Sequence, residues 1–309
     1  MEGLAFRGLR EAGVAPPAGL AEDARRVARN NLLFIGELLR LDAAFAGAGI
    51  ELLFVKGVTL AKLAYGDPGV KSGIDIDILV APERVEASAA LLQECGYGLA
   101  TPSAGEDTAG IVRRWHGHAK ESVWRHRVSG TTLDLHTRLS DSKAMLPAVG
   151  MASPRQAVEI APGRSLPTLA DEPLFAYLCV HGSSSAWFRL KWLADVAALL
   201  APRSPGDIDR LYAASQELGA GRAADQALLL AADLFATKLS DSLDRKLRGR
   251  RASRYLAAAA RELLGEEREP TEGRFGTLQI HLSQLLLRPG LLFKVAEAKR
   301  QLLGTWRNR

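Results

Sequence analysis

The sequence predicts an α+β protein with a small mixed β-sheet, helices flanking that sheet and a helical C-terminal domain. Two changes in hydrophobic period predict this arrangement. Residues 20–47 place apolar side chains at helical spacing, and short apolar runs bounded by glycine follow between residues 50 and 136. From about Pro154 alanine, leucine and arginine dominate, which is typical of helices. We therefore expect a helical lead-in over residues 1–48 that packs on the core, an α/β core over 49–140 and a helical domain over 154–309.

The composition is that of an ordinary globular protein. Of 309 residues, 47% are hydrophobic and 24% are charged, which excludes a disordered or fibrous chain. The two cysteines, Cys95 and Cys179, lie in apolar stretches and cannot form a disulfide framework. The sequence shows no secretory signal pattern and no apolar run near the ~18 residues that span a bilayer. We expect a cytoplasmic protein without a membrane partner.

The predicted core begins with a strand, a helix and a second strand. Residues 50–55 (IELLFV) are apolar and bounded by glycines, as in a buried strand, and Lys56-Gly57 ends them. Residues 58–65 predict a short helix, and Gly66-Asp67-Pro68-Gly69 is a turn. Residues 74–80 (IDIDILV) then alternate, with isoleucines on one face and two aspartates on the other.

The remaining elements follow from turns and from helical periodicity. Pro82 begins a helix that ends near Cys95, and Ser129-Gly130 joins residues 122–128 and 131–136 in a predicted hairpin. Residues 1–19 are rich in glycine, alanine and proline and predict a loose lead-in. Further helices are predicted over residues 172–200 (with a break near Gly182), 207–218, 223–235, 243–264, 277–287 and 291–303.

Asp75 and Asp77 are the most informative residues of the chain. Carboxylates two residues apart on a strand point to the same side, and their burial is costly unless a positive charge offsets it. Mg²⁺ favours such carboxylates together with phosphate oxygens, and a third acid from a neighbouring strand, Asp134, completes a two-ion site. The alternatives are an exposed strand with solvated acids, or an ion pair of Asp77 with Lys71 or Arg138.

Lys56 and Gly57 predict a phosphate site. A glycine between a strand and a helix lets backbone N–H groups approach phosphate, and the start of the helix favours negative charge. Lys71 precedes Asp75 by four residues and is a second candidate for phosphate binding; the alternative is an ordinary loop lysine.

Together these motifs resemble a known group of enzymes. The chain resembles the polymerase-beta-type nucleotidyltransferases, and more narrowly a bacterial group of uncharacterised nucleotidyltransferase-like proteins. The resemblance covers roughly residues 30–200. Its matching residues are Val55-Lys56-Gly57, Leu60, Tyr65, Lys71, the run Asp75–Val80, Gly96-Tyr97, Asp134-Leu135-His136, the run Cys179–Gly182 and the run Trp187–Asp195.

The resemblance implies transfer of a nucleoside monophosphate from a nucleoside triphosphate, with ATP or GTP as the expected donor. Asp75, Asp77 and Asp134 would hold Mg²⁺, with Mn²⁺ as the second choice, and Asp134 would help to deprotonate an acceptor hydroxyl. Lys56, Gly57 and Lys71 would hold phosphates. Two positions depart from the wider pattern: Val58 follows Gly57 where serine or glycine is usual, which leaves Thr59 as the nearest hydroxyl, and Lys71 stands where relatives carry arginine.

Two further candidates, His136 and Lys191, keep two interpretations each, and a pair of histidines does not complete a zinc site. His136 shares the face of Asp134 and would orient a phosphate or the acceptor, or pack at the strand end. Lys191 would wall the nucleotide pocket, or pair with Asp195 on a bracing helix. His116 and His118 lack the two further ligands of a zinc site.

The sequence does not identify the acceptor of the nucleotidyl group. A hydroxyl of a small molecule or a peptide fits an enzyme that tailors natural products or modified peptides. A toxin-like enzyme acting on tRNA or protein is the alternative, because the region from residue 241 carries 15 Lys and Arg against 8 Asp and Glu, although nucleic acid is not the favoured partner. A catalytically inactive nucleotide-binding protein is the third.

Overall fold

The computed structural model describes residues 2–71, 75–266, 270–272 and 276–307. The chain divides into two compact units. The first unit contains residues 1–139 and 150–170, and the second contains residues 140–149 and 171–309. None of the described helices is both long and apolar enough to cross a bilayer.

The first unit is built on the expected mixed sheet. Its strands lie in the order β1-β2-β5-β4-β3; β2 and β5 run parallel, and the other neighbours are antiparallel. The predicted hairpin is confirmed as β4 and β5. The strands are β1 (Leu52–Phe54), β2 (Asp75–Val80), β3 (Tyr97–Thr101), β4 (Glu121–His126) and β5 (Thr132–His136).

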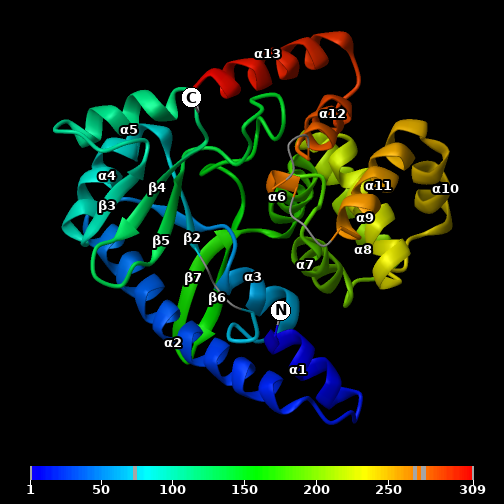
Figure 1. Cartoon of the computed structure of the whole chain (residues 1–309), viewed down its shortest axis with the longest axis horizontal. Helices are drawn as coiled ribbons and strands as arrows, with labels where there is room; N and C mark the ends of the chain where they lie inside the picture. The colour runs from blue at the N-terminus through cyan, green and yellow to red at the C-terminus, as the bar shows by residue number, and fades with distance from the viewer. Residues whose placement is uncertain (1, 72–74, 267–269, 273–275, 308–309) are drawn as a thin grey trace. The chain divides into compact units, whose positions relative to one another are not determined.

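Alternation along β2 separates an apolar face from an acidic face. Ile76 and Ile78 are buried in one core cluster with Leu133 and Leu135 of β5. The same cluster takes in side chains of α2 (Ala18–Gly47), α4 (Val85–Glu94) and α5 (Thr108–His116), and Figure 1 shows α2 as one long helix beside the sheet. Each fully buried side chain of this size stabilises the fold by roughly 1.5–3 kcal/mol. The opposite face of β2 is therefore left for the aspartates.

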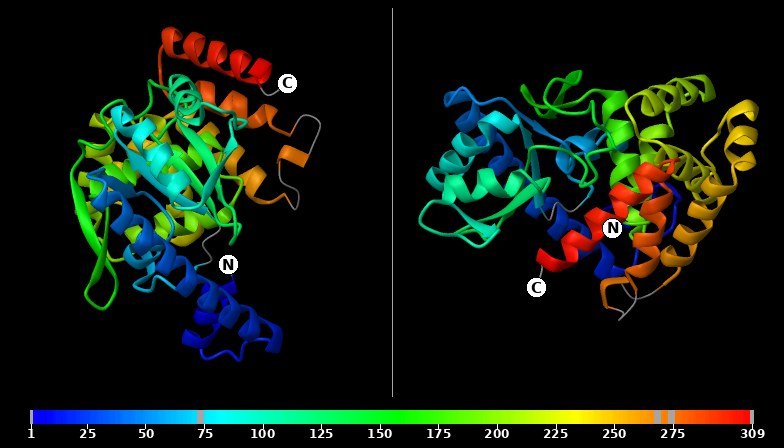
Figure 2. Two further views of the ribbon diagram at one scale, coloured as in Figure 1. Left: turned by 90° about the vertical axis from the view of Figure 1, so that its left-hand side faces the viewer. Right: turned by 90° about the horizontal axis from the view of Figure 1, so that it is seen from above.

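The first helices and the turn after β1 follow the sequence closely, with one exception. Residues 18–47 form the single helix α2, and α3 (Val58–Tyr65) has the predicted bounds. The expected loose lead-in is wrong, because Glu2–Glu11 form α1, which packs on α2. The two blue helices of Figure 2 are α1 and α2.

Two elements between the helix after Pro82 and the hairpin were not predicted from the sequence. A second small sheet was not predicted either. β3 and α5 occupy residues that carried no prediction. Residues from 154 onward were expected to be helical, but β6 (Arg155–Ala161) and β7 (Arg164–Leu169) pair as an antiparallel hairpin in the first unit, where β7 lies beside β1. Gly163, at φ 68°, makes the tight turn between them.

The second unit is helical, as expected, with two breaks. The break predicted near Gly182 in the helix over 172–200 is confirmed, since α6 ends at Ser184 and α7 begins at Leu190. Between them Trp187 adopts φ 57°, and its buried ring lies so close to Gly182 that a Cβ on that glycine would come within 2.3 Å of it. The helix predicted over 243–264 breaks at Arg250, which pairs with buried Asp225 at 2.8 Å. The helices are α6 (Asp171–Ser184), α7 (Leu190–Leu200), α8 (Pro205–Glu217), α9 (Arg222–Phe235), α10 (Asp241–Gly249), α11 (Arg251–Leu264), α12 (Leu278–Leu286) and α13 (Leu291–Arg307).

Candidate active site

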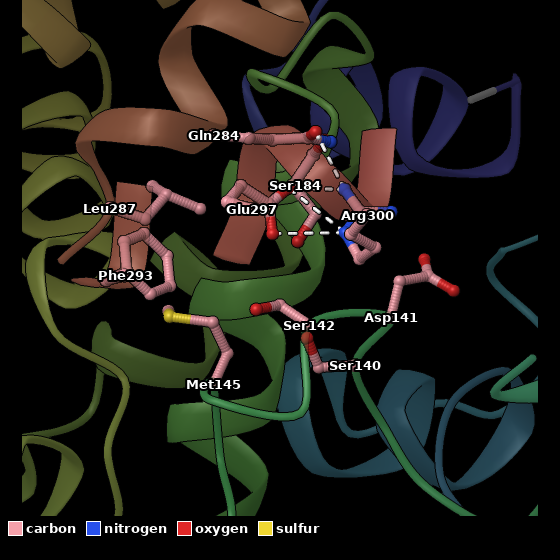
Figure 3. A pocket seen from close by; sticks show the side chains of 10 residues that line it. All are labelled: Ser140, Asp141, Ser142, Met145, Ser184, Gln284, Leu287, Phe293, Glu297 and Arg300. Atoms are coloured by element: carbon pink, nitrogen blue, oxygen red, sulfur yellow. Dashed lines mark hydrogen bonds and ion pairs between the residues drawn. The ribbon is translucent and has the colours of Figure 1, made fainter. Parts of the chain in front are cut away.

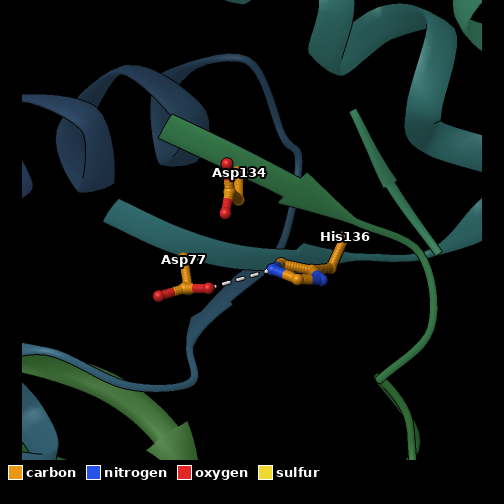
Figure 4. Close-up of side chains that lie close together, drawn as sticks. All are labelled: Asp77, Asp134 and His136. Carbon is orange, nitrogen blue, oxygen red and sulfur yellow. Dashed lines mark hydrogen bonds and ion pairs between the residues drawn. The ribbon is translucent and has the colours of Figure 1, made fainter. Parts of the chain in front are cut away.

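The register of the two parallel strands brings three polar side chains together. Asp77 of β2 lies opposite Asp134 of β5, and Leu79 lies opposite His136. Directly paired residues point to the same side of a sheet, so Asp77, Asp134 and His136 share one face. Each offers one ligand atom within 4.8 Å of the others (Figure 4). Among the described residues, this is the group that meets the distance requirement of a metal site.

Asp77 is buried, and two neighbouring side chains offset its negative charge. Its side chain is 2% exposed, and its Oδ1 lies 2.8 Å from Nζ of Lys56 and 3.1 Å from Nε2 of His136. Burial alone would raise the pKa of Asp77, but Lys56 and His136 hold that pKa well below its usual range. The carboxylate is therefore ionised and ready to accept a cation.

Asp134 has the opposite electrostatic environment. Burial, the carboxylate of Asp77 and the carboxylate of Glu121 raise the pKa of Asp134 to about 7. Two acids that face each other without a full set of counter-charges repel, and a divalent cation would relieve this repulsion. The burial of the site, its carboxylate groups and the distances between its ligand atoms therefore fit a divalent ion.

Glu121 is a site residue that sequence reasoning missed. It begins β4, and the antiparallel register with β5 places it opposite His136. Its Oε2 lies 3.3 Å from Nδ1 of His136 and 3.0 Å from Nζ of Lys120. The predicted strand began one residue later, at residue 122, so Glu121 fell outside it. The register of the predicted hairpin could have identified Glu121 as a neighbour of His136.

The Lys56-Gly57 turn lies at the start of α3. Gly57 has φ 71° and ψ −125°, a conformation that favours glycine, and a Cβ at this position would meet no atom within 4 Å. Gly57 is the N-cap residue of α3 and offers no side chain to cap the first N–H groups of the helix, which have no partner within a helix. This geometry suits an anion such as phosphate.

The hydroxyl of Thr59 does not face this space. Thr59 is 1% exposed, and its Oγ1 donates to the carbonyl oxygens of Phe54 and Lys56 at 3.2 Å each. These contacts brace the turn from within. Nothing in them supports a direct role in phosphate binding, which stays a prediction.

The other predicted site residues lie outside the three-residue group. Asp75 starts β2 on the face of Asp77 and contributes to the raised pKa of Asp134. The backbone carbonyl of Lys71 accepts a hydrogen bond from Asn31 at 2.8 Å, and residues 72–74, with Ile74 of the predicted strand, lie outside the described residues. Lys191 belongs to α7 of the second unit. The roles of these three residues stay predictions.

His116 has a structural environment. Its Nδ1 lies 2.9 Å from Oγ1 of Thr137, and its Nε2 lies 3.0 Å from Oγ of Ser122. Burial lowers the pKa of His116 to about 4, so the ring is neutral at pH 7. His118 is exposed, and the two histidines do not form part of the candidate metal group.

A second polar pocket lies within the helical unit (Figure 3). Glu297 of α13 is 3% exposed and accepts a hydrogen bond from Nε of Arg300 at 3.0 Å. Arg300 also donates from Nη2 to Oε1 of Gln284 on α12 at 3.0 Å. These groups satisfy one another and join the last two helices, so their arrangement is explained by packing.

The chain matches a known protein family over most of its length. Residues 1–236 match the model of a protein family described as "Uncharacterised nucleotidyltransferase". No curated protein matches the chain. The match includes all of the first unit, and with it Lys56, Asp77, Asp134 and His136.

Proposed function

Because this chain belongs to an uncharacterised family of nucleotidyltransferases, we propose that it moves a nucleoside monophosphate from a nucleoside triphosphate to a hydroxyl of a small molecule or peptide. The observation that carries this proposal is the group of Asp77, Asp134 and His136 on one sheet face. This group belongs to the same unit as Gly57, whose conformation at the start of α3 supports phosphate binding.

The donor set suits a divalent ion, with Mg²⁺ or Mn²⁺ as the expected metal. When bound, the ion supplies charge stabilisation for the transferring phosphoryl group, which is worth several kcal/mol. Asp77 and Asp134 would be its carboxylate ligands, and Asp75 lies two residues before Asp77 on the same face. The buried position of Asp77 fixes the carboxylate before the nucleotide arrives.

Lys56 and the first turn of α3 would hold the phosphates. The side chain of Lys56 is 19% exposed, so it is accessible from the site surface while its Nζ contacts Asp77. The space beside Gly57 is open, since a Cβ at this position would meet no atom within 4 Å, and this supports the approach of a phosphate to the start of α3. Lys71 would add a further positive charge.

The proposed reaction balances without another reactant. The acceptor oxygen forms a bond to the α-phosphorus, the bond from that phosphorus to the bridging oxygen breaks, and pyrophosphate leaves. The hydroxyl proton passes to a carboxylate oxygen of Asp134, which the proposal places beside the acceptor. ATP or GTP is the expected donor, and a tailoring role in natural-product or modified-peptide biosynthesis is the proposed context.

A labelling screen tests the proposal. The purified chain is incubated with each α-labelled nucleoside triphosphate and Mg²⁺ or Mn²⁺, against candidate small molecules, peptides, proteins and tRNA. Metal-dependent labelling of a small molecule or peptide with pyrophosphate release is expected. Labelling of tRNA or protein would favour a toxin-like enzyme, and metal-independent nucleotide binding without transfer would favour an inactive binding protein.

A further inference from the structure

We propose that the metal of this site is a divalent first-row transition ion with one nitrogen ligand, Nε2 of His136, beside the carboxylates of Asp77 and Asp134. Glu121 would act as the positioning residue that orients the imidazole. This inference rests on the proposed function and names the metal class and the ligand set of the same site. The sequence alone suggested an all-carboxylate magnesium site, so the nitrogen ligand comes from the structure.

The imidazole of His136 lies beside the two aspartates, where it could bind the same cation. Nε2 of His136 lies 3.1 Å from Oδ1 of Asp77, and the ligand atoms of Asp77, Asp134 and His136 all lie within 4.8 Å of one another. His136 is 1% exposed and belongs to β5, so packing fixes its ring. A cation held by the two aspartates would lie within reach of this nitrogen.

The second ring nitrogen supplies an independent observation. Nδ1 of His136 lies 3.3 Å from Oε2 of Glu121, and Glu121 is held in turn by Lys120 at 3.0 Å. The separation of Nδ1 and Glu121 is an ion-pair contact, and Nδ1 makes no hydrogen bond to the described residues. In metal sites a carboxylate at the second nitrogen of a histidine fixes the tautomer and raises the basicity of the ligand, and Glu121 lies at that position here. In the metal-free chain Nε2 makes a hydrogen bond with Oδ1 of Asp77; a bound cation would take the place of that hydrogen, and the ring proton would then be on Nδ1.

The ligand chemistry selects the metal. Mg²⁺ prefers oxygen ligands and retains several waters, whereas imidazole favours first-row transition ions. Two carboxylates and one imidazole would therefore bind Mn²⁺ or a later transition ion more tightly than Mg²⁺. The same site would keep open positions for phosphate oxygens, since the group found among the described residues supplies three ligands.

Pulsed electron paramagnetic resonance on Mn²⁺ tests the ligand assignment. Mn²⁺ is added to the metal-free full chain, alone and with ATP, and nitrogen hyperfine coupling to the ion is measured. The chain has six histidines, so a sample labelled with ¹⁵N only at histidine identifies an imidazole nitrogen without any substitution. We expect a coupling that changes from the ¹⁴N to the ¹⁵N pattern in the labelled sample.

Two variants assign the coupling to a residue. His136→Gln should abolish it and should lower the preference for Mn²⁺ over Mg²⁺ by about 10-fold, measured by competition. His118→Gln is the matched control, because His118 is exposed and lies outside the group, and should retain both properties. The ¹⁵N result on the unmodified chain stands even where His136→Gln folds poorly.

Three outcomes separate this inference from the proposed function. Mn²⁺ that binds without histidine coupling, while metal-dependent ATP binding persists, overturns the nitrogen ligand and leaves the nucleotidyltransferase proposal intact. Absence of Mn²⁺ and Mg²⁺ binding, with and without ATP, overturns both. A coupling that survives His136→Gln assigns the nitrogen to another histidine and overturns the inference.

Discussion

The ammonium of Lys56 and the carboxylate of Asp77 form an ion pair, with Nζ and Oδ1 2.8 Å apart. The same Oδ1 lies 3.1 Å from Nε2 of His136. In the metal-free chain, Lys56 therefore supplies the positive charge that buried Asp77 needs. A divalent ion bound to Asp77 would replace that charge and release Lys56 for a phosphate.

Lys56→Met should make the stability of the first unit depend on metal. Breaking a buried ion pair costs about 3–5 kcal/mol, so the metal-free variant should melt at a lower temperature than the unmodified chain. Mn²⁺ should raise the melting temperature of Lys56→Met more than that of the unmodified chain, because the ion no longer competes with an ammonium for Asp77. Scanning calorimetry with and without Mn²⁺ measures both effects.

Lys62→Met on the same short helix is the control for Lys56→Met. Lys62 lies on α3, and its substitution should leave the response to Mn²⁺ unchanged. Weaker Mn²⁺ stabilisation of Lys56→Met than of the unmodified chain would contradict the competition between Lys56 and the metal.

Asp77→Asn and Asp134→Asn should shift the stability of the metal-free chain in opposite directions. Asp77→Asn removes the partner of Lys56 and should destabilise the fold by up to about 3–5 kcal/mol. Asp134→Asn removes a charge that its neighbours disfavour, and should stabilise the fold at pH 8. Both should abolish metal-dependent nucleotide binding.

The gain in stability expected of Asp134→Asn follows from the pKa of Asp134. The folded-state pKa of about 7 lies above the usual value of 3.8, so the ionised side chain costs stability, and that cost grows as pH rises from about 4 to 7. At about 1.4 kcal/mol per pKa unit, the gain in Asp134→Asn at pH 8 is up to about 4 kcal/mol. Urea unfolding at pH 5 and pH 8 measures it, and an equal gain at both pH values would contradict the interpretation.

The sequence predicted the acidic face but not its internal partners. Strict alternation over residues 74–80 places Asp75 and Asp77 on one side of a strand, whatever that strand's neighbours are. The contacts of Asp77 with Lys56 and His136 depend on the parallel register of β2 with β5 and on the path of the turn after β1. Neither is encoded in local periodicity, and Lys71 and Arg138 were therefore considered as partners in place of Lys56.

The β6–β7 hairpin was missed although its turn is visible in the sequence. Pro162-Gly163 lies between two runs whose inward residues, Val158, Ile160 and Leu166, are buried. The surrounding alanine and leucine content outweighed this short alternation. Tertiary packing beside β1 decides the structure of such a segment, and a composition argument cannot supply that packing.

Glu121→Gln should weaken metal binding without unfolding the protein. The amide keeps the size of the side chain but removes the charge that faces Nδ1 of His136 at 3.3 Å. Loss of such a partner typically costs 10–100-fold in metal affinity. Titration calorimetry with Mn²⁺ should show a decrease of about that size, while the melting temperature of the metal-free variant stays close to that of the unmodified chain. An unchanged Mn²⁺ affinity would remove Glu121 from the site.

His116 should make the chain acid-sensitive through a mechanism separate from the acidic site. Burial lowers the pKa of His116 to about 4 in the folded chain, against 6.5 in the unfolded chain. Because the folded value is the lower one, the unfolded state binds the proton first. The contribution of His116 is thus fully present above pH 6.5, declines as pH falls toward 4 and is lost below it.

The size of this effect is about 3 kcal/mol, from about 1.4 kcal/mol per pKa unit. His116→Gln keeps a polar side chain between Thr137 and Ser122 but cannot take up the proton. Its free energy of unfolding should therefore fall less between pH 7 and pH 4.5 than that of the unmodified chain, whereas exposed His118→Gln should follow the unmodified chain. Because His116 lies outside the metal group, Mn²⁺ affinity at pH 7 should stay the same in both variants. Parallel pH dependences for the unmodified chain and His116→Gln would show that other groups control acid unfolding.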